Sequence, residues 1–259
     1  MGPFAATIAG MDSSQTSEPT GKSPSSFATT HWSLIVCAGE KDRPAAHQAL
    51  SDLCARYWYP LYAFLRRSGS DHDQAQDLVQ GFFLELIEHA RVAAADPERG
   101  RFRTFLLASL KNYQANEHRK NKTIKRGGQA IQVSIDFAVG QQLYANEPFH
   151  SLTPEKLYER KWALQLIQRC LGQLESDAHV SGRAALFEKV KPLFHGEDTE
   201  TGYQQIADEL EITVSAVKVA VHRWRDKFRE LIREEIRHTV ATDLEVDEEV
   251  ELLFAAITG

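Results

Sequence analysis

A cluster of basic and small side chains near the carboxyl end of the chain has the residue types that contact DNA bases. It lies in YQQIADELEITVSAVKVAVHRWRDKFRELI, residues 203–232, whose apolar spacing predicts two helices joined by a tight turn, a helix-turn-helix. Small residues let the second helix enter the major groove, and Lys or Arg can reach guanine edges or phosphates. The outward residues of that helix are Ser215, Ala216, Lys218, Val219, His222, Arg223 and Arg225.

The same spacing predicts the inner faces that hold these two helices together. They are formed by Ile206, Ala207, Leu210, Val214, Val217 and Val221. The turn carries Glu211 where glycine is usual, because one residue there adopts a left-handed conformation. We therefore expect an altered or strained turn. The alternative interpretation is a helical hairpin in a bundle that does not bind DNA.

A second group of basic residues lies near the middle of the chain. Residues 99–126 hold nine Lys or Arg against one acid, although the whole chain of 259 residues has a net charge of -6. The bases flank aromatic side chains and amides, a combination that suits single-stranded or melting DNA. The alternative is a solvated polar face beside a flexible basic linker, which is what most charge runs are.

The segment DHDQAQDLVQGFFLELIEH, residues 71–89, predicts a helix that begins at an Asp71 cap. Its two neighbouring phenylalanines, Phe82 and Phe83, are not expected to face the same interior. One of them should then be exposed and rimmed by carboxylates, which is typical of a protein interface. The alternative is burial of both by the preceding helix.

Helical periodicity dominates the chain and predicts an all-α protein. Expected helices cover 44–67, with a kink or break at Pro60, 71–89, 102–119, a segment from Pro154, 183–194 and 203–237. We expect two small helical domains, 28–126 and 153–238, joined by a linker at 127–152 that could hold a strand at Ile131–Ile135. A disordered tail at 1–27 and an acidic extension at 239–259, ending in a helix, complete the chain.

Several function classes find no support in the sequence. It has no nucleotide-binding glycine motif, nucleophile elbow or zinc spacing, so neither a cofactor nor an enzyme activity is expected. No run reaches the ~18 apolar residues of a membrane span, and the N-terminus does not read as a secretory signal. The three cysteines, Cys37, Cys54 and Cys170, are expected to be reduced thiols of a cytoplasmic protein.

Four segments, taken in order over about residues 46–233, resemble the extracytoplasmic-function sigma factors of bacterial RNA polymerase. ALSDLCARYWYPLYAFLRRSG is similar to the first helices of that family. DHDQAQDLVQGFFLEL resembles its helix D-A-E-D-L-V-Q-E-x-F, which binds the clamp helices of the polymerase. RFRTFLLASLKN resembles F-x-x-W-L-x-x-I-A-x-N, which is tied to promoter opening and -10 recognition, and residues 203–229 resemble the domain that reads the -35 element.

The resemblance implies a non-enzymatic initiation subunit whose partners are core RNA polymerase and promoter DNA. A regulatory protein of the anti-sigma or kinase type is a further candidate partner. The implied polymerase contacts are Asp77, Gln80, Phe83, Glu85 and Leu86. The implied -10 contacts are Arg99, Arg101, Arg103, Lys111, Asn112, His118, Arg119 and Lys120, and the outward residues of the second helix above would read the -35 element.

Three departures from the family pattern affect these expectations. Gly81 stands where the family often has Glu, and Val219 and Ala220 replace a polar pair in the reading helix. The acidic extension lies beyond the usual end of the family, and we expect it to be regulatory by masking the basic reading helix. The competing hypothesis is a stand-alone helix-turn-helix regulator that binds duplex DNA without polymerase.

Overall fold

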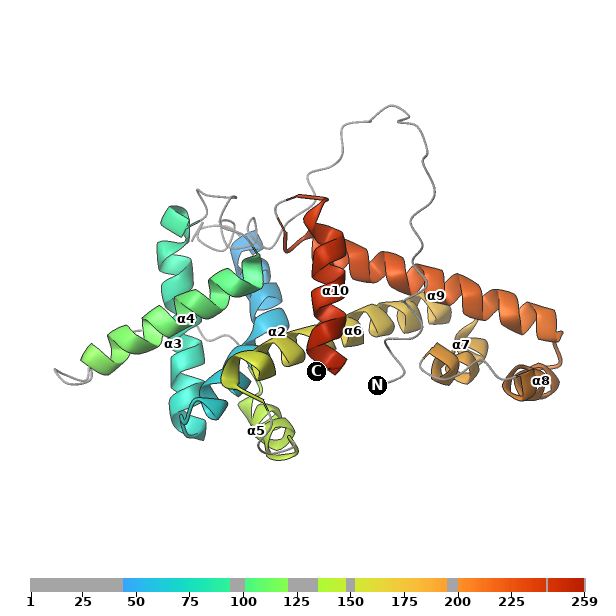
Figure 1. Ribbon diagram of the computed structural model, residues 1–259, viewed down its shortest axis with the longest axis horizontal. Helices are drawn as coiled ribbons and strands as arrows, with labels where there is room; N and C mark the ends of the chain where they lie inside the picture. Colours follow the sequence, from blue (N-terminus) through green and yellow to red (C-terminus); the bar gives the residue numbers. More distant parts are fainter. Residues whose placement is uncertain are drawn as a thin grey trace, which may run out of the picture.

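The computed structural model describes residues 44–93, 101–120, 135–147, 152–194, 200–240 and 242–258. Within these ranges every regular element is helical, in agreement with the predicted all-α class. The elements are α2 (Pro44–Arg67), α3 (His72–Ala93), α4 (Phe102–Lys120), α5 (Phe137–Ala145), α6 (Pro154–Val180), α7 (Ala184–Val190), the 3-10 turn η2 (Lys191–Phe194), α8 (Glu200–Glu209), α9 (Val214–Arg237) and α10 (Glu245–Thr258). In Figure 1, α2, α3 and α4 lie at one end, α7 and α8 at the other, and α10 stands between them.

The first helix, α2, runs through Pro60 without a break. Of the kink or break expected at Pro60, the break is therefore wrong. A proline removes one backbone donor and clashes with the preceding turn, but Tyr57, Leu61 and Tyr62 around it are all buried. Tertiary burial of this kind outweighs the local cost and keeps the segment helical. The helix ends at Gly69, which has a φ of 102° and donates its N–H to the Arg66 carbonyl.

The helix α3 begins where the sequence predicts, because the N–H of Gln74 donates to Asp71 Oδ1 at 2.8 Å. The prediction that Phe82 or Phe83 is exposed is wrong, since each side chain is 2% exposed. The helix packs against both α2 and α4, so two of its sides are covered. The Phe82 ring lies 6.1 Å from that of Tyr113 in α4.

The long helix α6 joins the two halves of the molecule into one core. It begins at Pro154, and Thr153 caps it by accepting a hydrogen bond from the N–H of Lys156. Its N-terminal part lies along α2, where Tyr158 and Trp162 are buried together with Tyr57. Buried side chains of α2, α6 and α9 belong to one continuous cluster.

The segment expected to be a linker contains the helix α5, which packs on α2. Asp136 caps this helix through the N–H of Val139, and the Phe137 ring lies 5.5 Å from that of Trp58. The expected strand falls mainly on residues 131–134, outside the described residues, and Ile135 is not in a strand. The sequence did not reveal this short helix, because only two of its residues, Phe137 and Gly140, are buried. Two buried positions are too few to give a helical period.

The helix-turn-helix consists of α8 and α9. Of the predicted inner faces, Ile206 and Ala207 of α8 and Val217 and Val221 of α9 are buried, and Leu210 and Val214 are half-buried. Glu211 adopts a φ of 53° in the turn, so a residue with a side chain occupies the left-handed conformation that glycine usually supplies. The turn keeps its shape, with the N–H of Ile212 bonded to the Ala207 carbonyl at 3.0 Å, and carries the predicted strain.

The acidic extension forms the expected final helix, α10. Its apolar side chains Val246, Val250 and Leu253 are buried, and the helix packs against both α6 and α9. The extension is therefore folded onto α6 and α9.

We expect Gly81→Ala to destabilise the protein although it improves helix propensity. A Cβ at this position would lie 2.1 Å from the hydroxyl oxygen of Tyr113, and overpacking of this kind lowers the free energy of unfolding by about 1–2 kcal/mol. Gly172→Ala in α6 is the matched control, because a Cβ there meets nothing within 4 Å and should add roughly 0.5–1 kcal/mol. Urea unfolding measures both, and Tyr113→Phe should restore most of the loss. Equal gains in the two alanine variants would contradict the clash.

We also expect Glu211→Gly to stabilise the helix-turn-helix by about 1 kcal/mol, since it removes the strain of a left-handed non-glycine residue. Gln204→Gly, at an exposed position inside α8, is the control and should lower the free energy of unfolding by roughly 1 kcal/mol. Thermal unfolding monitored by circular dichroism would compare the two. A lower midpoint for Glu211→Gly would show that its conformation is not strained.

Candidate nucleic-acid interface

The start of α9 presents an open, weakly basic face. Thr213 caps the helix by accepting a hydrogen bond from the N–H of Ala216 at 3.2 Å, so the first turn is fixed. Six of the seven predicted reading residues are exposed: Ser215, Ala216, Lys218, Val219, His222 and Arg223. The Lys218 ammonium lies 5.5 Å from the Tyr203 ring centroid, and His222 Nδ1 lies 2.8 Å from an Asp226 carboxylate oxygen.

The seventh residue, Arg225, turns back into the fold. Its Nη2 donates to the Leu193 carbonyl at 2.7 Å, and its side chain is half-buried. The prediction that Arg225 faces outward is therefore corrected. The helix rotates by 100° per residue, so position 225 lies beside Val221 and Phe228, which are buried. The guanidinium holds α9 to the end of η2.

The helix α4 carries the second basic surface, and its C-terminal half is open. Asn112, His118 and Arg119 are exposed, and Arg119 Nη2 donates to Asn116 Oδ1 at 2.8 Å. Lys120 is the last residue of α4, and its side chain is not described. Arg99 lies outside the described residues. Phe102 and Leu106 are buried, so the apolar side of α4 is core.

Lys111 is exposed but paired. Its ammonium lies 2.7 Å from Glu155 Oε1 in α6 and 5.4 Å from the Phe64 ring centroid. The hydrogen bond from Lys111 lowers the pKa of the Glu155 carboxyl. This ion pair links α4 to the first turn of α6.

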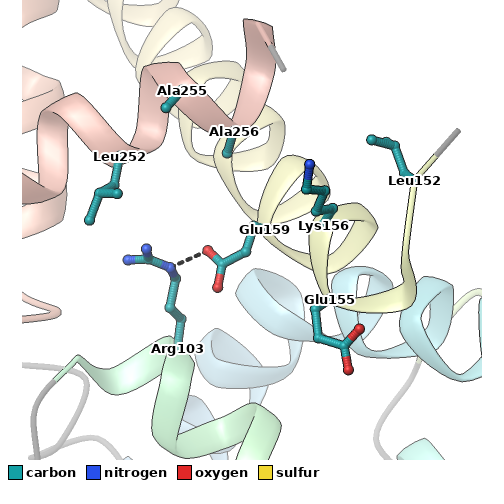
Figure 2. A pocket seen from close by; sticks show the side chains of 8 residues that line it. All are labelled: Arg103, Leu152, Glu155, Lys156, Glu159, Leu252, Ala255 and Ala256. Atoms are coloured by element: carbon teal, nitrogen blue, oxygen red, sulfur yellow. Dashed lines mark hydrogen bonds and ion pairs between the residues drawn. The ribbon is translucent and has the colours of Figure 1, made fainter.

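The N-terminal turn of α4 is not open. Arg103 is 5% exposed, its guanidinium pairs with Glu159 of α6 and Glu249 of α10, and it lies 4.4 Å from the Trp162 ring centroid. The backbone carbonyl of Arg103 also accepts a hydrogen bond from the Tyr158 hydroxyl at 2.9 Å. Figure 2 shows the side chain pointing from α4 toward α6 and α10. The expectation that Arg103 is a surface contact is corrected: in this conformation DNA cannot reach it.

Arg101 shares one of these partners. Its Nε lies 2.8 Å from Glu249 Oε2, and its Nη2 lies 3.4 Å from Glu248 Oε2. Glu159 and Glu249 are functional neighbours that the sequence did not reveal, because each is far from the arginines along the chain. The general excess of acids in the extension was the one available signal.

The outer side of α3 is polar. Of the predicted polymerase contacts, Asp77 and Gln80 are exposed and Glu85 is half-buried. Phe83 and Leu86 are buried, at 2% and 7% exposure, so their assignment to an exposed patch is corrected. Gly81 faces Tyr113 of α4, and burial together with nearby acids raises the pKa of Tyr113 to about 12.

Among the described residues, no group of three His, Cys, Asp or Glu side chains is placed to bind a metal. No helix of the described ranges has the length and apolar character needed to cross a membrane. Burial raises the pKa of the Cys54 and Cys170 thiols to about 12, so both are poor nucleophiles. Cys37 lies outside the described residues.

The comparisons with known proteins bear on the first half of the chain. Residues 53–124, which cover most of α2 and all of α3 and α4, match the family model for sigma-70 region 2. No curated protein and no solved structure matches the chain. A sigma-70 region 2 domain implies RNA polymerase and promoter DNA as partners. The chain contains this domain, which implies a sigma factor: a non-catalytic protein that binds RNA polymerase and recognises promoters.

Proposed function

We propose that the protein is a sigma factor of the extracytoplasmic-function group, which directs polymerase to a specific set of promoters. The observation that carries this proposal is the exposed face formed by residues 215–223. It lies at the start of α9, the second helix of the helix-turn-helix, whose N-cap is fixed. It lies at the opposite end of the molecule from α4 (Figure 1). Two separate DNA-facing helices suit a protein that reads two promoter elements.

In this proposal, Lys218 and Arg223 contact the -35 element from the major groove. The exposed residues of α4, Asn112, His118 and Arg119, contact the -10 element, where amides and cations suit melted DNA. The polar outer side of α3, with Asp77 and Gln80, binds core polymerase. A regulatory protein of the anti-sigma or kinase type remains a candidate partner, to which we assign no surface.

The first test is competition with a housekeeping sigma factor for core RNA polymerase. The wild-type chain should displace it, and Asp77→Arg should weaken displacement at least tenfold, because it reverses a charge at the proposed contact. Glu188→Arg, an exposed residue of α7, is the matched control and should compete like the wild type. A folded chain that fails to displace the housekeeping factor would contradict the proposed polymerase contact.

The second test separates reading residues from structural ones in α9. Lys218→Ala and Arg223→Ala should each cost about 1–3 kcal/mol of promoter binding by the holoenzyme if they contact bases, with an unchanged Tm. Arg225→Ala should lower stability by roughly 1 kcal/mol, because it removes the bond to the Leu193 carbonyl. Promoter titration and thermal unfolding of all three variants give the comparison. Unaltered promoter binding by Lys218→Ala and Arg223→Ala would refute this reading face.

A further inference from the structure

The acidic helix α10 packs over the N-terminal turn of α4. Glu249 is fully buried, although it carries a carboxylate. It pairs with Arg103 and lies 2.8 Å from Arg101 Nε, while Glu159 supplies a second carboxylate to Arg103. A buried charge is tolerated only when it is paired, and removing one partner leaves the others uncompensated. Docking of α10 is thus tied to these two arginines.

The same helix is also tied to α9. Asp247 Oδ1 lies 2.5 Å from Arg233 Nη1, and Asp243, just before α10, lies 3.1 Å from Arg237 Nε. Glu235 of α9 pairs in addition with Arg56 of α2. The extension therefore bridges the region 2 domain and α9, the helix that begins with the reading face.

The charge of the docked helix opposes DNA. Asp247, Glu248 and Glu251 are exposed on α10, beside the turn that holds Arg101. A DNA backbone that approached this turn would meet carboxylates, and the arginines are already neutralised.

The far end of α10 is less tightly packed than its start. A pocket of about 370 Å³ separates Leu252, Ala255 and Ala256 of α10 from Glu155 and Lys156 of α6. Figure 2 shows these side chains on opposite sides of the pocket. Side chains that line a void have fewer contacts to lose, so the helix can leave more easily than its buried start suggests.

We propose that α10 is an intramolecular clamp that covers the N-terminal turn of α4 by placing Glu249 between Arg101 and Arg103, and that productive binding to polymerase and promoter requires this contact to open. The clamp masks the N-terminal turn of the -10 helix, whereas the sequence suggested masking of the reading helix. This inference rests on the proposed function, because it assigns regulation to the same DNA-facing surfaces.

The test compares Glu249→Gln with Glu251→Gln in the full chain. The second variant removes an exposed acid of the same helix and is the matched control. Spin labels at Gln141→Cys in α5 and Ala255→Cys in α10, with Cys37 replaced by Ser, report the distance between α10 and the first half of the chain. Both label positions are exposed, whereas Cys54 and Cys170 are buried.

Glu249→Gln should replace one short interspin distance by a longer and broader distribution, and Glu251→Gln should not. Affinity for core polymerase should rise at least tenfold, since apparent affinity is reduced by the fraction of chains that are competent to bind. Arg101→Gln, which breaks the contact from the other side, should open the chain in the same way.

The clamp would be overturned if Glu249→Gln and Arg101→Gln, both folded, kept the wild-type interspin distance and bound polymerase within twofold of the wild-type affinity. Loss of helicity in Glu249→Gln and Arg101→Gln would also overturn the clamp, since the contact would then be needed for folding and could not be released. A chain that opens but never binds polymerase would support the clamp as a conformational device and contradict the proposed function instead.

Discussion

Arg103 holds a full positive charge at a position that water scarcely reaches, and the placement of three helices depends on satisfying it. An uncompensated buried charge is very costly, so carboxylates must reach the guanidinium. They come from Glu159 in α6 and Glu249 in α10, while the Trp162 ring covers the cation at 4.4 Å. Because α4, α6 and α10 each contribute one part, the contact fixes their relative placement, and release of α10 leaves Arg103 paired with Glu159 alone. The apolar contacts of α6 with α2 bury surface between the two halves. The charged cluster adds contacts of fixed geometry between the region 2 domain and the C-terminal half.

The shared core also explains why the two halves form one body although the sequence is divided by a Gly- and Pro-containing segment. The N-terminal half of α6 buries Tyr158 and Trp162 against α2, and its C-terminal half buries Leu174 and Ala178 among the later helices. One helix thus serves both halves. Between these two halves of α6, a polar cluster joins three helices. It consists of Arg56 in α2, Arg169 in α6 and Glu235 in α9. Burial lowers the pKa of Arg169, and the Glu235 carboxylate opposes that shift.

Local signals in the sequence predicted most of the helices, and long-range contacts account for what they missed. Caps at Asp71 and Thr153, and the apolar spacing of α8 and α9, act within a few residues and can be read directly. Whether Phe82 and Phe83 are both buried depends on α2 and α4, which cover two sides of α3. Arg103 and Arg225 looked like surface cations for the same reason: their partners, Glu249 and the Leu193 carbonyl, are distant in sequence. The open positions Lys218, Arg223 and Arg119 were predicted correctly as exposed, because they lie on faces that no other described element covers.

The distribution of charge follows from the same contacts. The acids of the extension account for much of the net charge of -6, and they sit beside the bases of α4. In the closed chain, Arg101 and Arg103 are neutralised internally, so they add nothing to attraction for DNA phosphates. Nonspecific DNA binding grows with the number of phosphates a protein neutralises, and a closed chain is therefore spared much of it. Under the proposed clamp, opening leaves the net charge unchanged but separates the acidic helix from the basic turn. The field needed at the -10 element would then develop only when polymerase holds the chain open, which is why a strongly basic surface can be carried by an acidic protein.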